Sequence, residues 1–254
     1  MLMMFEAQRQ DLAETVRLMF DRKDTNIAGG NVSMKVFDET GKAYILITPS
    51  FMSETFYARL SPAQILVVDM ATGEKVDGVG TVTREINMHE GAYRANPGIR
   101  TVFHAHAPES MFWATSGLEM PNVTEGTREL GRIRTLPYAP ATSMALAKTV
   151  SDALAELGDR AMENVFLLNS HGVVITATDL HIAVRVLETL EWNAKIAYQQ
   201  TVFIHLGLLK GYQSCGADYQ PVEDEEHPAI SLPNQPVVDH PAPLPKVNRV
   251  TFGG

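Results

Sequence analysis

The 254-residue chain has a single cysteine, Cys215. One cysteine excludes a disulfide within the chain and a metal cluster held by several thiolates. A reducing compartment is the simple inference, and any metal site must use imidazole and carboxylate ligands.

Basic residues are also scarce. The chain has 21 Lys and Arg against 30 Asp and Glu, which gives a formal net charge of −9 at pH 7. Nucleic acids and anionic membranes bind basic surfaces, so neither is expected as the main partner. An anionic substrate would have to be captured by donors placed locally in a pocket.

Long apolar runs are absent as well. No run of about 18 apolar residues occurs, and the N-terminal sequence turns polar after residue 5, which argues against a membrane span and a signal peptide. We therefore expect a cytoplasmic protein. With 45% hydrophobic residues, a chain of this length can form one large domain with a substantial core.

Hydrophobic periodicity predicts an α/β protein. We expect helices at residues 5–21, 81–96, from 108 through 113, 142–157 and from 180 to about 206. We expect strands at residues 32–37, 43–48, 65–68, 102–106, and a buried strand at 165–168 that is interrupted and resumes at 173–175. Seven of the 14 prolines lie between residues 221 and 245. The pattern indicates one domain over residues 1–210 and a Pro-rich C-terminal tail over 211–254.

Two histidines stand two residues apart in the run Val102-Phe103-His104-Ala105-His106. Side chains alternate along a strand, so His104 and His106 lie on the same face and can coordinate the same metal ion. The plain alternative is that two histidines share a half-buried strand without a ligand.

Two further residues complete a candidate ligand set. His171 interrupts an apolar strand, and leaving a buried imidazole unsatisfied costs roughly 1–3 kcal/mol. Glu85 sits near the start of a helix, where a carboxylate is favoured. With His104 and His106 they supply three imidazole nitrogens and a carboxylate oxygen, a set suited to Zn²⁺ or a similar divalent ion. Structural zinc prefers thiolates, so a catalytic site is implied.

A glycine pair precedes the first strand, with Gly30 followed by Asn31. Paired glycines let backbone N–H groups approach a ligand, so this segment is a candidate anion nest. The alternative is a simple turn.

Five short motifs occur together in one order. They are I-A-G-G-N-V-S (27–33), I-T-P-S (47–50), T-R-E with its following helix (83–93), V-F-H-A-H-A (102–107) and N-S-H-G-V-V (169–174). In this combination the chain resembles the class II aldolase/adducin family over roughly residues 8–210.

The resemblance implies a three-layer α/β/α fold with a largely antiparallel central sheet, and a homotetramer with active sites between subunits. It also implies that His104, His106 and His171 bind a metal, with zinc as the default and manganese or cobalt as alternatives. Glu85 would bind the metal at rest and act as acid and base during turnover.

The implied activity is that of a metal-dependent lyase in carbohydrate metabolism. The expected reaction is aldol cleavage of a small anionic ketose or keto-acid, which need not be the usual sugar phosphate, through a metal-stabilised enediolate. Family epimerases carry Asp where this chain has Glu85, so glutamate favours the lyase.

Several positions depart from the family pattern. Thr83-Arg84 replaces a serine pair, and Phe51 replaces a glycine. The guanidinium of Arg84 is a positive charge that can bind phosphate or carboxylate. We therefore expect Arg84 to bind the anionic group of the substrate, assisted by Asn31 and Thr83. Gly30 and Ser50 are further expected substrate-binding residues. The alternative for Arg84 is a surface salt bridge.

The sequence does not single out one residue as the proton donor. The family's tyrosine is replaced by Glu125, and the candidates that remain are Glu125, Tyr138 and Tyr212.

Rival functions stay open as well. They are a decarboxylase of 3-oxo acid phosphates, a sugar-phosphate epimerase, a cupin that uses Glu109 as its glutamate, and a non-enzymatic adducin-like scaffold. A cupin is strand-dominated, whereas this chain has strong helical patterns.

Overall fold

The computed structural model describes residues 3–27 and 29–214. The Pro-rich tail predicted for residues 211–254 lies outside the described residues from Cys215 onward.

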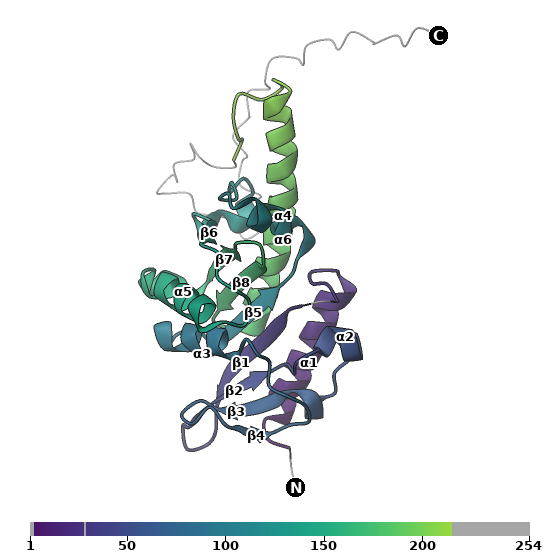
Figure 1. Cartoon of the computed structure of the whole chain (residues 1–254), viewed down its shortest axis with the longest axis vertical. Coiled ribbons are helices and arrows are strands. Elements are labelled where there is room, and N and C mark those ends of the chain that lie inside the picture. The colour runs from purple at the N-terminus through teal and green to yellow at the C-terminus, as the bar shows by residue number, and fades with distance from the viewer. Residues whose placement is uncertain (1–2, 28, 215–254) are drawn as a thin grey trace, which may run out of the picture. The chain divides into compact units, whose positions relative to one another are not determined.

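The described residues form one eight-stranded sheet in the order β4-β3-β2-β1-β5-β8-β7-β6 (Figure 1). The strands are β1 (Asn31–Phe37), β2 (Ala43–Ile47), β3 (Leu66–Asp69), β4 (Lys75–Asp77), β5 (Thr101–Ala105), β6 (Arg134–Leu136), β7 (Asn164–Leu168) and β8 (Gly172–Ala177). Every neighbouring pair is antiparallel except β6 with β7. The prediction of an α/β protein with a largely antiparallel sheet is confirmed.

The helices supply two separate hydrophobic clusters. They are α1 (Glu6–Asp21), α2 (Met52–Phe56), α3 (Ile86–Ala95), α4 (Pro108–Ser116), α5 (Met144–Ala155) and α6 (Leu180–His205), with 3₁₀ turns η1 (Pro62–Gln64), η2 (Glu125–Leu130) and η3 (Gly158–Met162). Helices α1, α4 and α6 contribute to one cluster, and α3 and α5 to the other. Alternate residues of β2 divide between them, with Leu46 in the first and Ile45 in the second, because successive strand side chains point to opposite faces.

The segment around His171 differs from the prediction. We expected one buried strand broken by a short interruption, but β7 and β8 form an antiparallel hairpin in which Leu168 pairs with Gly172. Ser170 in the turn has a φ of 58°, a left-handed conformation that reverses the chain. Two apolar runs in sequence look the same whether the chain continues or turns back, so the pattern could not distinguish them.

Two short strands were not predicted. Both β4 and β6 are three residues long, and only Leu136 of β6 is buried among their side chains, so neither is long enough to show a hydrophobic alternation. Helix α5 also begins later than expected, because the Ser143 hydroxyl accepts a hydrogen bond from the Leu146 N–H and caps the helix there.

The three central strands meet at one end of the sheet. Asn31 of β1 is paired with His104 of β5, and His104 is paired in turn with Val174 of β8. The start of β1, the end of β5 and the start of β8 therefore lie side by side. Asn31, His104, His106 and His171 lie in or next to these strand ends, whereas Glu85 comes from the start of α3.

None of the helices within the described ranges has the length and hydropathy of a transmembrane segment.

Asn193 connects α6 to the irregular segment before η2 and generates a stability prediction. Its buried Oδ1 accepts from the N–H groups of Val123 (2.8 Å) and Thr124 (3.1 Å), and its Nδ2 donates to the Pro121 carbonyl (2.9 Å). Asn193→Ala leaves these peptide groups unpaired, so we expect the free energy of unfolding to fall by about 2–4 kcal/mol in urea denaturation.

Gln199→Ala on the exposed side of the same helix serves as the control. It should change the free energy of unfolding by less than about 0.5 kcal/mol. Equal effects of the two substitutions would show that the Asn193 side chain does not hold this segment.

Candidate metal centre and active site

Three imidazoles converge at the end of the central strands. The ligand nitrogens of His104, His106 and His171 all lie within 4.8 Å of one another, and the Nε2 atoms of His104 and His106 are 3.1 Å apart. His104 lies in β5, His106 directly follows it, and His171 stands in the β7–β8 turn. The structure thus brings together the three histidines that the sequence singled out.

His104 is oriented by the backbone behind it. Its Nδ1 donates to the Val173 carbonyl at 2.9 Å, which leaves the unprotonated Nε2 facing the other two histidines. Burial lowers the pKa of His104 to about 4, because the charged imidazolium loses its hydration in the interior. At neutral pH the ring is therefore neutral, with its lone pair toward the cluster, as a metal ligand must be.

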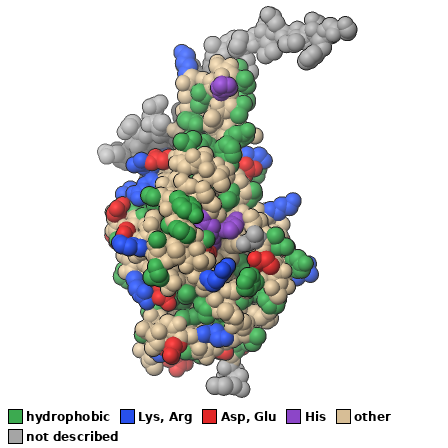
Figure 2. All heavy atoms as spheres, in the orientation of Figure 1, with side chains coloured by type: hydrophobic (Ala, Val, Ile, Leu, Met, Phe, Trp, Pro, Cys, Tyr) green, Lys and Arg blue, Asp and Glu red, His purple; other side chains and the backbone are tan. Residues whose placement is uncertain are grey.

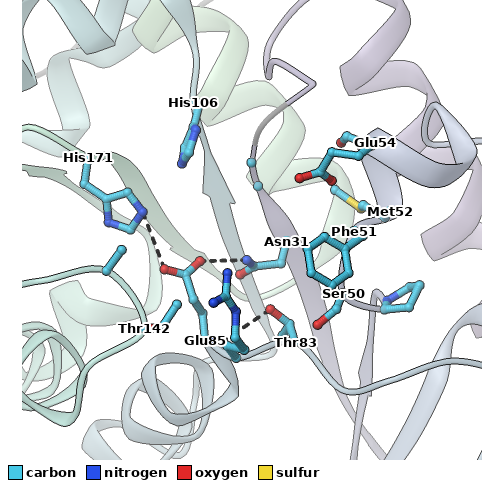
Figure 3. A pocket seen from close by; sticks show the side chains of 16 residues that line it. Asn31, Ser50, Phe51, Met52, Glu54, Thr83, Glu85, His106, Thr142 and His171 are labelled. Carbon is cyan, nitrogen blue, oxygen red and sulfur yellow. Dashed lines mark hydrogen bonds and ion pairs between the residues drawn. The ribbon is translucent and has the colours of Figure 1, made fainter.

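Glu85 lies directly beside the histidines (Figure 3). Its Oε2 is 3.4 Å from His104 Nε2, and its Oε1 is 3.5 Å from His171 Nε2. We expected Glu85 inside the first turn of the helix; it stands instead at the N-cap, one residue before Ile86. Its backbone N–H donates to the Thr83 hydroxyl at 3.3 Å, which fixes the turn that aims the carboxylate at the cluster.

Opposing effects act on the pKa of Glu85. Burial raises it, whereas the neighbouring His104 and the hydrogen bond from Asn31 lower it, and the net direction is downward. Because burial keeps His104 neutral above pH about 4, the 2.8 Å bond from Asn31 Nδ2 to Oε2 is the contact that favours the carboxylate at neutral pH.

The donor set fits a divalent cation. It combines one carboxylate with three imidazoles whose pKa values burial lowers, so the histidines are neutral at neutral pH. The Oε1 atom of Glu85 is buried and accepts no hydrogen bond in the part of the chain that the structure describes. A buried carboxylate oxygen without a donor is costly unless a cation compensates it. The residues present are therefore able to hold a zinc-like ion.

Two glycines make room for the imidazoles. A Cβ at Gly29 would lie 2.0 Å from Cε1 of His106. A Cβ at Gly172 would lie 3.0 Å from Cδ2 of His106 and 3.1 Å from Cε1 of His104, and 2.6 Å from the Ala105 carbonyl oxygen. From sequence, the glycine pair at 29–30 indicated an anion nest or a turn. The structure shows a further reason for Gly29, which is the close approach of a histidine ring.

A cavity of about 240 Å³ opens beside the cluster. Its lining includes all five expected substrate-binding residues, which are Gly30, Asn31, Ser50, Thr83 and Arg84. The guanidinium of Arg84 is exposed and makes no hydrogen bond or ion pair with any described residue. The salt-bridge alternative for Arg84 therefore finds no partner in the described ranges.

The position of the site on the surface is visible in Figure 2, where histidine side chains reach the centre of one face beside a basic side chain. A cavity this small is below the usual size of a drug-sized pocket and suits a compact ligand.

The three candidate proton donors do not line this cavity. Glu125 is exposed at the start of η2, Tyr138 is exposed, and the Tyr212 hydroxyl is 2.8 Å from that of Thr201. Other residues that sequence reasoning did not single out do line it, and they include Ser53, Glu54 and Thr142. No motif marked them, because they reach the cavity from a five-residue helix and an irregular loop.

Fold and site together define an α/β protein with a candidate metal centre in a small polar cavity. Residues 10–198 match the family model of the class II aldolase and adducin N-terminal domain. The chain belongs to the class II aldolase/adducin family, as its motifs predicted.

Curated relatives carry several activities. An L-fuculose phosphate aldolase of Methanococcus vannielii is 31% identical over 187 residues, covering 71% of this chain and 93% of the relative. A 5-deoxy-D-ribulose 1-phosphate aldolase of Bacillus thuringiensis is 25% identical, covering 78% and 87%. A 3-oxo-tetronate 4-phosphate decarboxylase of Haemophilus influenzae is 28% identical, covering 76% and 87%.

Solved structures show the same fold. An L-fuculose 1-phosphate aldolase superposes with a TM-score of 0.65 at 24% identity, covering 77% of this chain and 86% of the other. An L-fuculose-1-phosphate aldolase of Thermus thermophilus gives 0.63 at 22% identity, covering 78% and 97%. At these identities the similarity shows the fold alone.

The tight contact at Gly29 yields a prediction for the cluster. In Gly29→Ala the new methyl group collides with the imidazole of His106, and the ring will rotate away because it is the movable partner. We expect the affinity for Co²⁺, followed by visible absorption, to fall at least about tenfold while the protein stays folded.

Gly211→Ala is the matched control, because a Cβ added there would have no heavy atom within 4 Å. It should bind Co²⁺ as the native protein does. Native affinity in Gly29→Ala would mean that His106 is not a ligand.

Proposed function

We propose that the protein is a divalent-metal-dependent lyase that cleaves a C–C bond in a small anionic ketose or keto-acid, whose anionic group is a phosphate or a carboxylate. The observation that carries this proposal is the convergence of three imidazoles and Glu85 on one point at the wall of a small cavity. Membership of the class II aldolase/adducin family and relatives named as sugar-phosphate aldolases support it.

In this proposal His104, His106 and His171 are the permanent metal ligands. Zinc is the default ion, and manganese or cobalt are alternatives. The bound cation would supply a Lewis acid that stabilises negative charge on a ketone oxygen and the adjacent hydroxyl oxygen of the substrate.

Glu85 is the proposed acid and base. Its carboxylate lies 3.4 Å from one imidazole and 3.5 Å from another, so it can occupy a ligand position at rest and turn to the substrate during turnover. When the C–C bond breaks, its electron pair stays on the carbon next to the ketone. The hydroxyl of the other half gives its proton to the separate proton-transfer group (Glu125, Tyr138 or Tyr212) as an aldehyde forms, and that group releases the proton to water. Glu85 takes up a proton from water and delivers it to the carbon, so protons balance over the whole reaction.

Substrate recognition is assigned to the polar wall of the cavity. Arg84 presents a guanidinium without a described partner, which can bind a phosphate or carboxylate through two hydrogen bonds. Asn31 and Thr83 assist it, and Gly30 and Ser50 add backbone and hydroxyl groups.

A specific feature also favours a second reaction, decarboxylation of a 3-oxo acid phosphate. Arg84 directly precedes Glu85, and a basic residue there occurs in decarboxylases of this family; one relative is named as such a decarboxylase. This reaction needs the same charge stabilisation and releases carbon dioxide in place of an aldehyde. An epimerase and an adducin-like scaffold are less favoured, because the site has Glu85 and a full ligand set.

We also propose a three-layer arrangement, supported by the two hydrophobic clusters, and a homotetramer with active sites between subunits. The proton donor would then come from a second copy, since Glu125, Tyr138 and Tyr212 do not line the cavity of their own chain. A cytoplasmic location remains an expectation from the single cysteine.

The reaction is tested by screening ketose phosphates and keto-acid phosphates for release of aldehyde or carbon dioxide, with and without chelator. Glu85→Gln removes the group that transfers protons, so we expect kcat to fall by about 10²–10⁴. Glu109→Gln, which changes the glutamate that a cupin would use, should leave kcat within about threefold of native. Activity retained in Glu85→Gln would remove the proposed role.

Arg84 is tested on the substrate identified in that screen. Arg84→Ala removes the charge that binds the anion, so we expect KM to rise about 10- to 100-fold, in line with 1.5–3 kcal/mol for a hydrogen bond to a charged group. Arg94→Ala is the control, since its side chain pairs with Glu90 on the same helix. An unchanged KM in Arg84→Ala would contradict anion binding at this position.

A further inference from the structure

A continuous line of buried hydrogen bonds runs from Glu85 into the protein. Asn31 Nδ2 donates to Glu85 Oε2 at 2.8 Å, and Asn31 Oδ1 is 2.5 Å from Nε2 of His89. On the other side of the ring, His89 Nδ1 is 2.7 Å from Ser33 Oγ, which is 2.7 Å from the Tyr93 hydroxyl. All five side chains are buried, and the proposed reaction uses only the first two.

The line follows from the geometry of two neighbouring elements. Glu85, His89 and Tyr93 are four residues apart at the start of and along α3, so they lie on one face of the helix, about 6 Å per step. Asn31 and Ser33 alternate on one face of β1, about 6.6 Å per step. Since the two repeats nearly match, the side chains interleave.

The chemistry of the groups fixes the direction of each hydrogen bond. A carboxylate only accepts, so the Asn31 amide must turn its NH₂ toward Glu85 and its oxygen toward His89. That oxygen only accepts, so Nε2 of His89 carries the proton. Burial lowers the pKa of His89 to about 3, so the ring is neutral and Nδ1 accepts from the Ser33 hydroxyl. The Ser33 oxygen in turn accepts from the Tyr93 hydroxyl.

From this arrangement we propose that His89 is a positioning residue, which holds the Asn31 amide in the one orientation that donates to Glu85. The inference rests on the proposed role of Glu85 at a metal centre. Without a donor on its oxygen, the amide can turn over and place that oxygen against the carboxylate. Glu85 would then lose its donor and meet a second acceptor in a buried site, and it would move from its position beside His104 and His171.

The experiment combines His89→Phe, which keeps a ring but has no nitrogen, with Asn31→Ala in a double-mutant cycle. Co²⁺ affinity is measured by visible absorption, and kcat/KM is measured on the substrate of the proposed reaction. We expect His89→Phe to weaken Co²⁺ binding about 10- to 100-fold. In the Asn31→Ala background the same substitution should add less than about threefold, because His89 acts through Asn31.

Rescue separates positioning from packing. Gln places an N–H donor near the position of Nε2, so His89→Gln should return Co²⁺ affinity to within about threefold of native. A His89→Leu variant of smaller volume repeats the measurement in case the phenyl ring does not fold. As a control, Thr176→Val removes a buried bond to the Ala161 carbonyl at the other end of the sheet, and it should lower stability without changing Co²⁺ affinity.

Native Co²⁺ affinity in folded His89→Phe or His89→Leu, or losses that multiply fully in the double variant, would overturn the inference. The proposed function fails separately. If no substrate is cleaved, the lyase assignment is wrong, but the double-mutant cycle of Co²⁺ affinities still tests the positioning role of His89. If the substrate is cleaved but the cycle shows no coupling, only the positioning role is lost.

Discussion

The register of β5 against its two neighbours is the constraint on which the site depends. Pairing of His104 with Asn31 on one side and with Val174 on the other places three strand ends together. Because strand side chains alternate, a slip of one residue would turn His104 and His106 to the opposite face of the sheet. The apolar residues beside and between them, Phe103 and Ala105, belong to the hydrophobic cluster on that opposite face and hold the register. The core that stabilises the fold therefore also orients the two histidines that we propose as ligands.

Burial then sets the charge of the site. Removing His104 from water keeps it neutral at physiological pH, and the carbonyl of Val173 selects the tautomer that presents Nε2. Glu85 is kept as a carboxylate by an amide that is itself held from behind by His89. A cluster of neutral nitrogens with one negative oxygen is suited to a divalent cation. Arg84 at the cavity wall has no ion-pair partner among the described residues, which is what the proposed binding of an anion requires.

Much of this could be predicted from sequence, because the signals were local. The spacing of His104 and His106 fixed a shared face as soon as the strand was recognised, and five ordered motifs indicated the family. The hairpin at His171 could not be predicted, since two apolar runs do not reveal whether the chain reverses between them. The spacing of His89 from Glu85 and Tyr93 is visible in the sequence, but it does not reveal the hydrogen bonds of His89 to Asn31 and Ser33 of β1. Its meaning depends on β1 lying alongside α3, which is a long-range contact.

The central claim is that three imidazoles bind one cation with Glu85 beside it. The most direct measurement is anomalous diffraction at the zinc edge from crystals grown with one equivalent of Zn²⁺ per chain. The account predicts a single peak about 2.0–2.1 Å from a ring nitrogen of each of His104, His106 and His171. A peak elsewhere, or none at the three histidines, would contradict it.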